Sequence, residues 1–164
     1  MKIGVDTGVL IASVKRRGEK FHEGAVRLSS AIKDGGHAAV ASSLVLIELP
    51  GGLSSSTRMP IDKIFEVEVS VQDNFELQVL PFEDYVDLTV ELVFTFRELK
   101  GKWGIGSADF HHIATSIEEK CGIFVTVDEN HLLRDECKKA FKKYIDVLDP
   151  NEAADALRSS GLKV

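Results

Sequence analysis

Four acidic residues, far apart in the chain, occupy positions at which carboxylates work together in α/β proteins. They are Asp6, Glu48, Asp109 and Asp128. Asp6 directly follows the short apolar run 2–5, and Asp128 directly follows the apolar run 123–127, each of which is typical of a buried strand. Ligands of open α/β sheets bind beyond the carboxyl ends of the strands. Both carboxylates are therefore expected at one ligand-binding edge.

The other two acids are expected on helices that begin at the same edge. Asp109 lies in the first turn of a helix that follows the glycine-rich loop 101–106, and Glu48 lies on the helix after the predicted strand 37–41. An acid in a first helical turn is also favoured by the helix dipole, so each residue alone has a purely structural explanation. Four acids that converge on one edge are harder to explain in that way.

Carboxylates gathered in one cleft repel one another, because like charges raise each other's pKa. A divalent cation relieves this repulsion, and a set of oxygen ligands suits Mg²⁺ or Mn²⁺ rather than Zn²⁺. Such a centre can polarise a phosphodiester, activate a water molecule and stabilise the leaving oxygen. The four acids together predict metal-dependent phosphodiester hydrolysis.

The elements that position these acids alternate along the chain. Strands are predicted at 2–5, 37–41, 75–80, 123–127 and 144–148. Helices are predicted from residue 8, at 23–33, from 44 to about Pro50, and at 83–99, 108–120, 132–143 and 150–158, with Ser42 or Ser43, Ser107 and Asp149 as caps. Residues 53–57 and 101–106 are predicted to be loops. This order predicts a mostly parallel sheet with helices on both faces, a three-layer α/β/α fold.

The segment 60–71 fits two structures. Phe65, Val67, Val69 and Val71 alternate with polar residues as in a strand, whereas Pro60 is typical of a first helical turn. The sequence leaves this choice open.

Length and composition narrow the function classes. A chain of 164 residues fits one domain, and its net charge of -6 means that any polyanion must be bound through a local basic patch or a cation. Two cysteines make no disulfide framework, and no apolar run approaches the roughly 20 residues of a membrane span. Asp6 also interrupts the apolar run that a secretory signal peptide would need. We expect a cytoplasmic protein that does not enter the membrane.

Four segments resemble the motifs of the PIN-domain family in their order and spacing. They are residues 5–11 (VDTGVLI), 46–49 (LIEL), 107–115 (SADFHHIAT) and 125–128 (VTVD). The resemblance spans residues 1–148 and implies a PIN-like nuclease domain at 1–150 with a helical tail of the same domain at 151–164. It also implies a Mg²⁺- or Mn²⁺-dependent endoribonuclease, and small relatives are commonly VapC-type toxins of toxin–antitoxin pairs.

The resemblance also assigns roles to residues. It makes Asp6, Glu48, Asp109 and Asp128 the catalytic and metal-binding acids, with Thr7 and Thr126 as supporting hydroxyls. His112, one helical turn from Asp109, is a further supporting candidate. The implied partners are an RNA substrate, an antitoxin protein and a second copy of the chain. Gly8 stands where many relatives carry Asn or Ser, and its missing polar side chain is expected to weaken activity.

Charged clusters suggest where RNA and a partner would bind. Arg16 and Arg17 follow the first helix, and Lys100 and Lys102 precede Asp109, so these four are candidates for contacts with RNA phosphates. Ordinary solvated helix faces explain them equally well. Trp103 is a candidate for base stacking or for covering the edge of the core. Residues 64–96 hold eight acids and no Lys or Arg, which suits a basic partner segment such as an antitoxin tail.

Two alternatives remain at this stage. A phosphatase of the haloacid dehalogenase type also begins with a strand that ends in Asp, but it needs a second Asp two residues later, where this chain has Gly8. The other alternative is a catalytically weak or inactive PIN-like module that binds RNA or serves in assembly. Gly8 and the negative net charge keep this second alternative open.

Overall fold

The computed structural model describes residues 1–161, and its centre is a five-stranded sheet in which every strand pairing is parallel. The strand order is β3-β2-β1-β4-β5. The strands are β1 (Lys2–Val5), β2 (Ala38–Ser42), β3 (Gln78–Leu80), β4 (Ile123–Val125) and β5 (Asp146–Leu148). In the central register, Gly4 of β1 lies between Val40 of β2 and Phe124 of β4. The predicted parallel sheet is confirmed.

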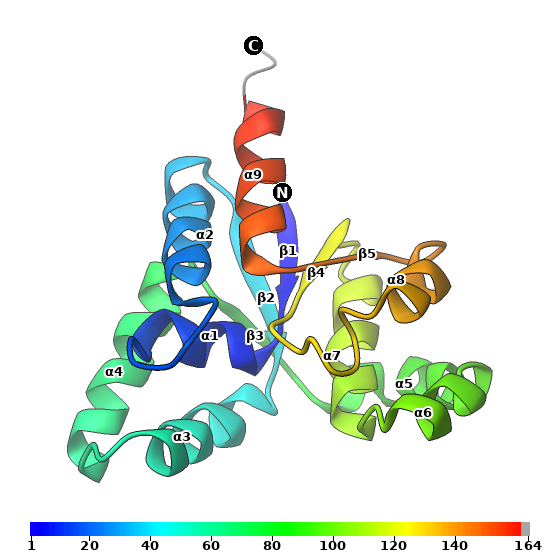
Figure 1. Cartoon of the computed structure of the whole chain (residues 1–164), viewed down its shortest axis with the longest axis horizontal. Coiled ribbons are helices and arrows are strands. Elements are labelled where there is room, and N and C mark those ends of the chain that lie inside the picture. Colours follow the sequence, from blue (N-terminus) through cyan, green and yellow to red (C-terminus); the bar gives the residue numbers. More distant parts are fainter. Residues whose placement is uncertain (162–164) are drawn as a thin grey trace.

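Helices cover both faces of this sheet. They are α1 (Thr7–Val14), α2 (His22–Asp34), α3 (Val45–Ser56), α4 (Ile61–Asn74), α5 (Val86–Thr95), α6 (Arg97–Trp103), α7 (Ser107–Glu118), α8 (Asp135–Phe141) and α9 (Pro150–Gly161), with a 3-10 turn at Glu83–Tyr85. Figure 1 shows α1 to α4 and α9 on one side of the sheet and α5 to α8 on the other. The three-layer α/β/α prediction is therefore confirmed.

Each layer of helices has its own apolar core, because successive strand residues point to opposite faces of a sheet. In β4, Phe124 packs with the α5–α8 side, whereas Val125 packs with the α1–α4 and α9 side. In β2, Val40 likewise belongs to the first of these cores and Ala41 to the second. Both faces of the sheet are thus buried, which is why its strands are short apolar runs.

Helix α3 is longer than predicted. It continues through Pro50 and two glycines to Ser56, so the expected end near Pro50 and the expected loop at 53–57 are wrong. A Cβ added at Gly52 would run into Cδ1 of Ile11 on α1, while Leu53 is fully buried. Gly52 therefore serves close packing between two helices instead of ending one, and burial outweighs the weak local propensity.

The open segment 60–71 is helical. Pro60 precedes α4 with an extended backbone, and Ile64 and Val71 point into the core. The apparent alternation placed Phe65 and Val69 among the buried positions of a strand, but both side chains are more than half exposed, as is Ile61. These three residues follow one another at four-residue spacing along α4, so they share one exposed helix face.

Further boundaries differ from the predictions. The expected helix 83–99 is a 3-10 turn followed by α5 and α6, which are separated at Phe96. Gly101 lies inside α6, and Gly104, with a φ of 68°, ends that helix in the left-handed conformation open to glycine. Strands β3, β4 and β5 and helix α8 are shorter than predicted.

The caps agree only in part with the sequence. Asp149 Oδ1 accepts the backbone N–H groups of Asn151 and Glu152 at 2.7 and 2.9 Å, as expected of the cap of α9. Ser42 Oγ accepts the N–H of Leu44, but Ser107 is the first helical residue of α7 instead of its cap.

Helix α9 packs against α2, and residues 162–164 of the predicted tail lie outside the described residues. No helix between residues 1 and 161 combines the length and apolarity needed to cross a membrane.

Candidate active site

The first two acids meet where the strand order reverses. From β1 the sheet extends to β2 and β3 on one side and to β4 and β5 on the other, so a crevice is expected at the carboxyl ends of β1 and β4. Asp6 follows β1, and its backbone N–H donates to the Val125 carbonyl of β4 at 2.9 Å. Thr126 then donates from Oγ1 to Asp6 Oδ2 at 2.8 Å. The stretch that leads to Asp128 is thereby held beside Asp6.

Helix α7 delivers Asp109 to the same edge. It crosses the sheet so closely that a Cβ added at Gly4 would lie 2.5 Å from the Cβ of Ser116. At its N-terminus, Asp109 Oδ2 accepts the backbone N–H of Gly106 at 2.7 Å. Asp109 therefore does have the structural role that an acid in a first helical turn can have. This contact uses only one of its two carboxylate oxygens. Asp6, by contrast, makes no capping hydrogen bond to α1.

Glu48 joins three helices through one carboxylate oxygen. It lies in the first turn of α3, where Oε2 accepts Thr7 Oγ1 of α1 at 2.6 Å. The same oxygen is 2.7 Å from His112 Nε2 of α7, whose side chain is only 2% exposed. A carboxylate can only accept, so Nε2 is the donor. His112 is thus a buried anchor of Glu48.

The charges of these groups act on one another. Burial raises the pKa of Asp6, and the charges of Glu48 and Asp128 add to the rise, against His112 and Thr126. Burial also raises the pKa of Asp109, to which the charges of Asp6 and Asp128 contribute. Asp6 thus interacts electrostatically with the other three predicted acids, and Asp109 interacts with Asp6 and Asp128. Asp6 and Asp109 are the acids whose charged form is disfavoured.

The pKa values of Glu48 and His112 shift against the effect of burial. Burial alone would raise the pKa of Glu48, but the hydrogen bonds from His112 and Thr7 outweigh it, and the pKa lies below its ordinary value. Burial alone would lower the pKa of His112, but the Glu48 hydrogen bond and the charges of Asp6, Glu48 and Asp109 raise it overall. The pair therefore favours an ionised carboxylate beside an imidazolium.

The donor set fits a divalent cation in its chemistry. Over residues 1–161 no Lys or Arg forms an ion pair with any of the four acids, and no group of three or more His, Cys, Asp or Glu side chains is arranged to hold a metal ion jointly. Mg²⁺ keeps several of its water molecules and often uses only one or two carboxylates. The carboxylates thus suit a hydrated ion and do not form a closed cage.

Each acid has one oxygen anchored and one left without a hydrogen bond in the described part of the chain. The anchors are Thr126 for Asp6, Thr7 and His112 for Glu48, Gly106 for Asp109 and His131 for Asp128. The two threonines singled out in the sequence both donate to acids of the site. An anchored carboxylate keeps its orientation, while no hydrogen bond within residues 1–161 competes with a ligand for the second oxygen.

His131 is a member of this site that sequence reasoning missed. Its Nδ1 lies 2.7 Å from Asp128 Oδ2, and its side chain is 40% exposed. The residue lies in a turn after β4, where neither helical nor strand periodicity applies. The only available signal was its position three residues after a candidate acid.

The side chain of Val127 occupies the space that a side chain at position 8 would need. A Cβ at position 8 would lie 2.8 Å from Val127 Cγ2 and 3.7 Å from Asp6 Oδ2. A Ser or Asn at this position would therefore need Val127 to move. Gly8 and Val127 are sterically matched, and the site has no polar side chain at position 8.

The four basic residues predicted to bind RNA differ in their surroundings. Arg16 and Arg17 follow α1, are exposed and make no ion pair among residues 1–161. Lys100 Nζ instead donates to the Ile105 carbonyl at 2.9 Å, and Lys102 pairs with Glu136 at 2.8 Å. Lys100 and Lys102 thus have structural contacts close to the loop before α7.

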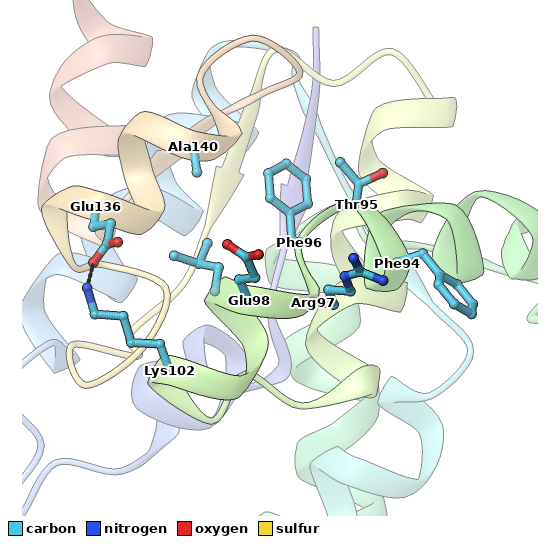
Figure 2. Close-up of a pocket in the computed structure, with 9 residues that line it drawn as sticks. Phe94, Thr95, Phe96, Arg97, Glu98, Lys102, Glu136 and Ala140 are labelled. Carbon is cyan, nitrogen blue, oxygen red and sulfur yellow. Dashed lines mark hydrogen bonds and ion pairs between the residues drawn. The ribbon is translucent and has the colours of Figure 1, made fainter.

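A cavity of about 690 Å³ lies between α6 and α8, away from the four acids. Figure 2 shows Lys102 reaching Glu136 at one end of this cavity and Arg97 beside Phe94 at the other. Next to it, Trp103 Nε1 donates to Glu136 Oε2 at 2.9 Å, and the Arg134 guanidinium lies 4.0 Å from the Trp103 ring centre. Trp103 is therefore held by charged neighbours. The cavity contains none of the predicted catalytic residues.

Fold and site together define a three-layer α/β/α protein with an acidic centre at the point where a parallel sheet reverses its strand order. The family model of the PIN domain matches residues 3–136, and the chain belongs to the PIN domain family, whose members are generally nucleases. This assignment replaces the phosphatase alternative.

Two solved structures have the same fold. One is VapBC2 from Rickettsia felis bound to a DNA fragment from its promoter, at 18% identity and a TM-score of 0.59, covering 91% of this chain and 98% of that one. The other is FitAcB from Neisseria gonorrhoeae, at 18% identity and a TM-score of 0.58, covering 92% and 98%. At this identity the likeness shows the fold alone. No curated protein matches the chain significantly in sequence.

Proposed function

We propose that this protein is a Mg²⁺- or Mn²⁺-dependent endoribonuclease that acts through Asp6, Glu48, Asp109 and Asp128. One observation carries the proposal: four carboxylates interact at the switch point of the sheet, with the pKa values of Asp6 and Asp109 raised by burial and by neighbouring negative charge. A cation relieves this repulsion. Membership of a family of nucleases supports the reaction class.

The chain's own residues have separate tasks in this proposal. Asp6, Asp109 and Asp128 hold the ion, and Thr126 and the Gly106 N–H keep two of these carboxylates in place. His112 and Thr7 keep Glu48 ionised and fixed in its orientation. When bound, the ion supplies the polarisation of a phosphodiester and the activation of a water molecule. Exposed Arg16 and Arg17 contact RNA phosphates.

The partners and location are part of the same proposal. The acidic stretch 64–96 and the exposed face of α4 formed by Ile61, Phe65 and Val69 support an antitoxin with a basic, amphipathic segment. The fold shared with VapBC2 and FitAcB supports a toxin of a toxin–antitoxin pair. A second copy of the chain as partner and a cytoplasmic location complete the proposal.

The decisive experiment is cleavage of a structured RNA by the purified protein with Mn²⁺. We expect cleavage that stops with EDTA and in the Asp6→Asn variant, but continues in Asp62→Asn, which neutralises an exposed acid on α4. Cleavage that persists in EDTA and in Asp6→Asn would overturn the metal site. RNA binding without cleavage of any RNA would favour the inactive binding module, for which Gly8 is the supporting feature.

A further inference from the structure

We infer that His131 is a positioning residue that orients Asp128 for the divalent cation by donating its Nδ1–H to Asp128 Oδ2. The inference rests on the proposed metal-dependent function and adds to it a residue outside the family motifs described above. Its basis is the contact of 2.7 Å between the two side chains. Because a carboxylate only accepts hydrogen bonds, the proton of this contact lies on Nδ1.

The turn that carries both residues is closed by its backbone. The Leu133 N–H donates to the Asp128 carbonyl at 2.9 Å, and the Asp128 N–H donates to Thr126 Oγ1 at 3.2 Å. These bonds hold the main chain of Asp128, but they do not set the direction of its carboxylate. Over residues 1–161, His131 is the one group that forms a hydrogen bond with that carboxylate.

The imidazole also lies near the turn before α7, the helix that carries Asp109. A Cβ added at Gly104, in the turn ahead of α7, would lie 3.9 Å from His131 Nε2. His131 therefore contacts Asp128 through Nδ1, while its Nε2 is near the turn that precedes Asp109. The bond from Nδ1 is the one hydrogen bond of the ring within residues 1–161, so the imidazole is oriented towards Asp128.

The surroundings of Asp128 leave its carboxylate in need of such an anchor. Its side chain is 25% exposed, and its charge repels the charges of Asp6 and Asp109. Without a donor, this repulsion favours rotation of the carboxylate towards solvent and away from the other acids. Partners that hydrogen-bond to a metal ligand typically account for about 10- to 100-fold in metal affinity.

Three substitutions of His131 distinguish the hydrogen bond donated by Nδ1 from the space that the ring fills. His131→Ala removes both ring nitrogens, His131→Asn keeps an N–H donor near the position of Nδ1, and His131→Gln places its amide near the position of Nε2. His37→Ala is the matched control, because His37 is a surface histidine just before the first residue of β2. It therefore lies at the end of the sheet opposite to the four acids. The affinity for Mn²⁺ is measured by electron paramagnetic resonance of free Mn²⁺ on the full chain, with the melting temperature recorded for every variant.

We expect His131→Ala and His131→Gln to bind Mn²⁺ about 10- to 100-fold more weakly than the wild type, and His131→Asn and His37→Ala to bind within about threefold of it. Wild-type affinity in His131→Ala would overturn the inference while leaving the metal site intact. The inference would also be overturned if His131→Asn bound Mn²⁺ as weakly as His131→Ala does. If the wild type binds Mn²⁺ no better than Asp128→Asn does, the proposed function itself fails.

Discussion

Glu48 Oε2 and His112 Nε2 lie 2.7 Å apart, and this contact joins α3 to α7 beneath the acidic centre. His112 is almost fully buried and Glu48 is one-third exposed. Because the pKa of His112 is raised and that of Glu48 is lowered, the pair contributes most when both are charged. The contact connects the orientation of a proposed catalytic acid to the stability of the fold.

The stability contribution of this pair should depend on pH. A raised histidine pKa stabilises the fold below about the ordinary value of 6.5 and ceases to do so as the pH rises through the folded-state pKa. A lowered glutamate pKa stabilises the fold above the ordinary value of 4.5 and ceases to do so as the pH falls through its folded-state pKa. The pair is therefore strongest between these two pH values.

His112→Gln tests this window, since glutamine keeps a donor near Nε2 without the charge. Measured by urea unfolding in EDTA, the variant should be less stable by about 2 kcal/mol between pH 4.5 and 6.5. The difference should shrink as the pH is raised towards 9. A difference that is constant from pH 5 to pH 9 would contradict an ionic contribution.

Asp6→Asn should make the metal-free protein more stable. Burial and neighbouring charge raise the pKa of Asp6, so its charged form is unfavourable in the fold at neutral pH, and asparagine removes the charge while still accepting from Thr126. We expect a gain of about 1 kcal/mol in the free energy of unfolding at pH 8 in EDTA.

Mn²⁺ should reverse this order of stability. A ligand at 100 times its Kd stabilises the wild type by about 2.7 kcal/mol, whereas the variant lacks the negative charge of this ligand and binds the ion more weakly. Thermal unfolding with and without Mn²⁺ measures both effects. A variant that is less stable than the wild type in EDTA would show that Asp6 is not under electrostatic strain.

The contact between Gly8 and Val127 predicts a rescue by a second substitution. Gly8→Ser alone should cost about 1 to 3 kcal/mol of stability, because its Cβ would lie 2.8 Å from Val127 Cγ2. Val127→Ala removes that methyl group, so the double variant should recover at least about 1 kcal/mol relative to the sum of the single changes. Additive losses would refute steric matching of the two positions. The RNA cleavage rate of the double variant then reports whether a hydroxyl at position 8 strengthens activity.

The close approach of α7 to the sheet makes Gly4 sensitive to the smallest side chain. Gly4→Ala places its Cβ 2.5 Å from Ser116 Cβ, a rigid part of a buried residue, and should destabilise the fold by about 3 kcal/mol. Gly122→Ala, beside the neighbouring strand β4, meets no atom within 4 Å and should change stability by less than about 0.5 kcal/mol. Equal effects of the two changes in urea unfolding would contradict this packing.

The alternating elements and the acids at their ends were readable from local patterns. A run such as 123–127 is short, apolar and followed by Asp128, so its strand and the edge that it faces follow from periodicity and parallel pairing alone. The same holds for β1 and Asp6. Local patterns were wrong at Gly52 and gave no decision around Phe65. Gly52 packs against another helix, and Phe65 has a strand-like alternation on an exposed helix face.

By itself, the sequence determined the five strands, most of the helices and the parallel sheet, and it selected the four acids as candidates. Only the tertiary structure decided which group anchors each acid: Thr126 lies 120 residues from Asp6, and His112 lies 64 residues from Glu48. Such contacts depend on the register of β1 against β4 and on the closeness of α7 to Gly4. Local propensity carries no information about either, because both arise from packing between segments that are distant in the chain.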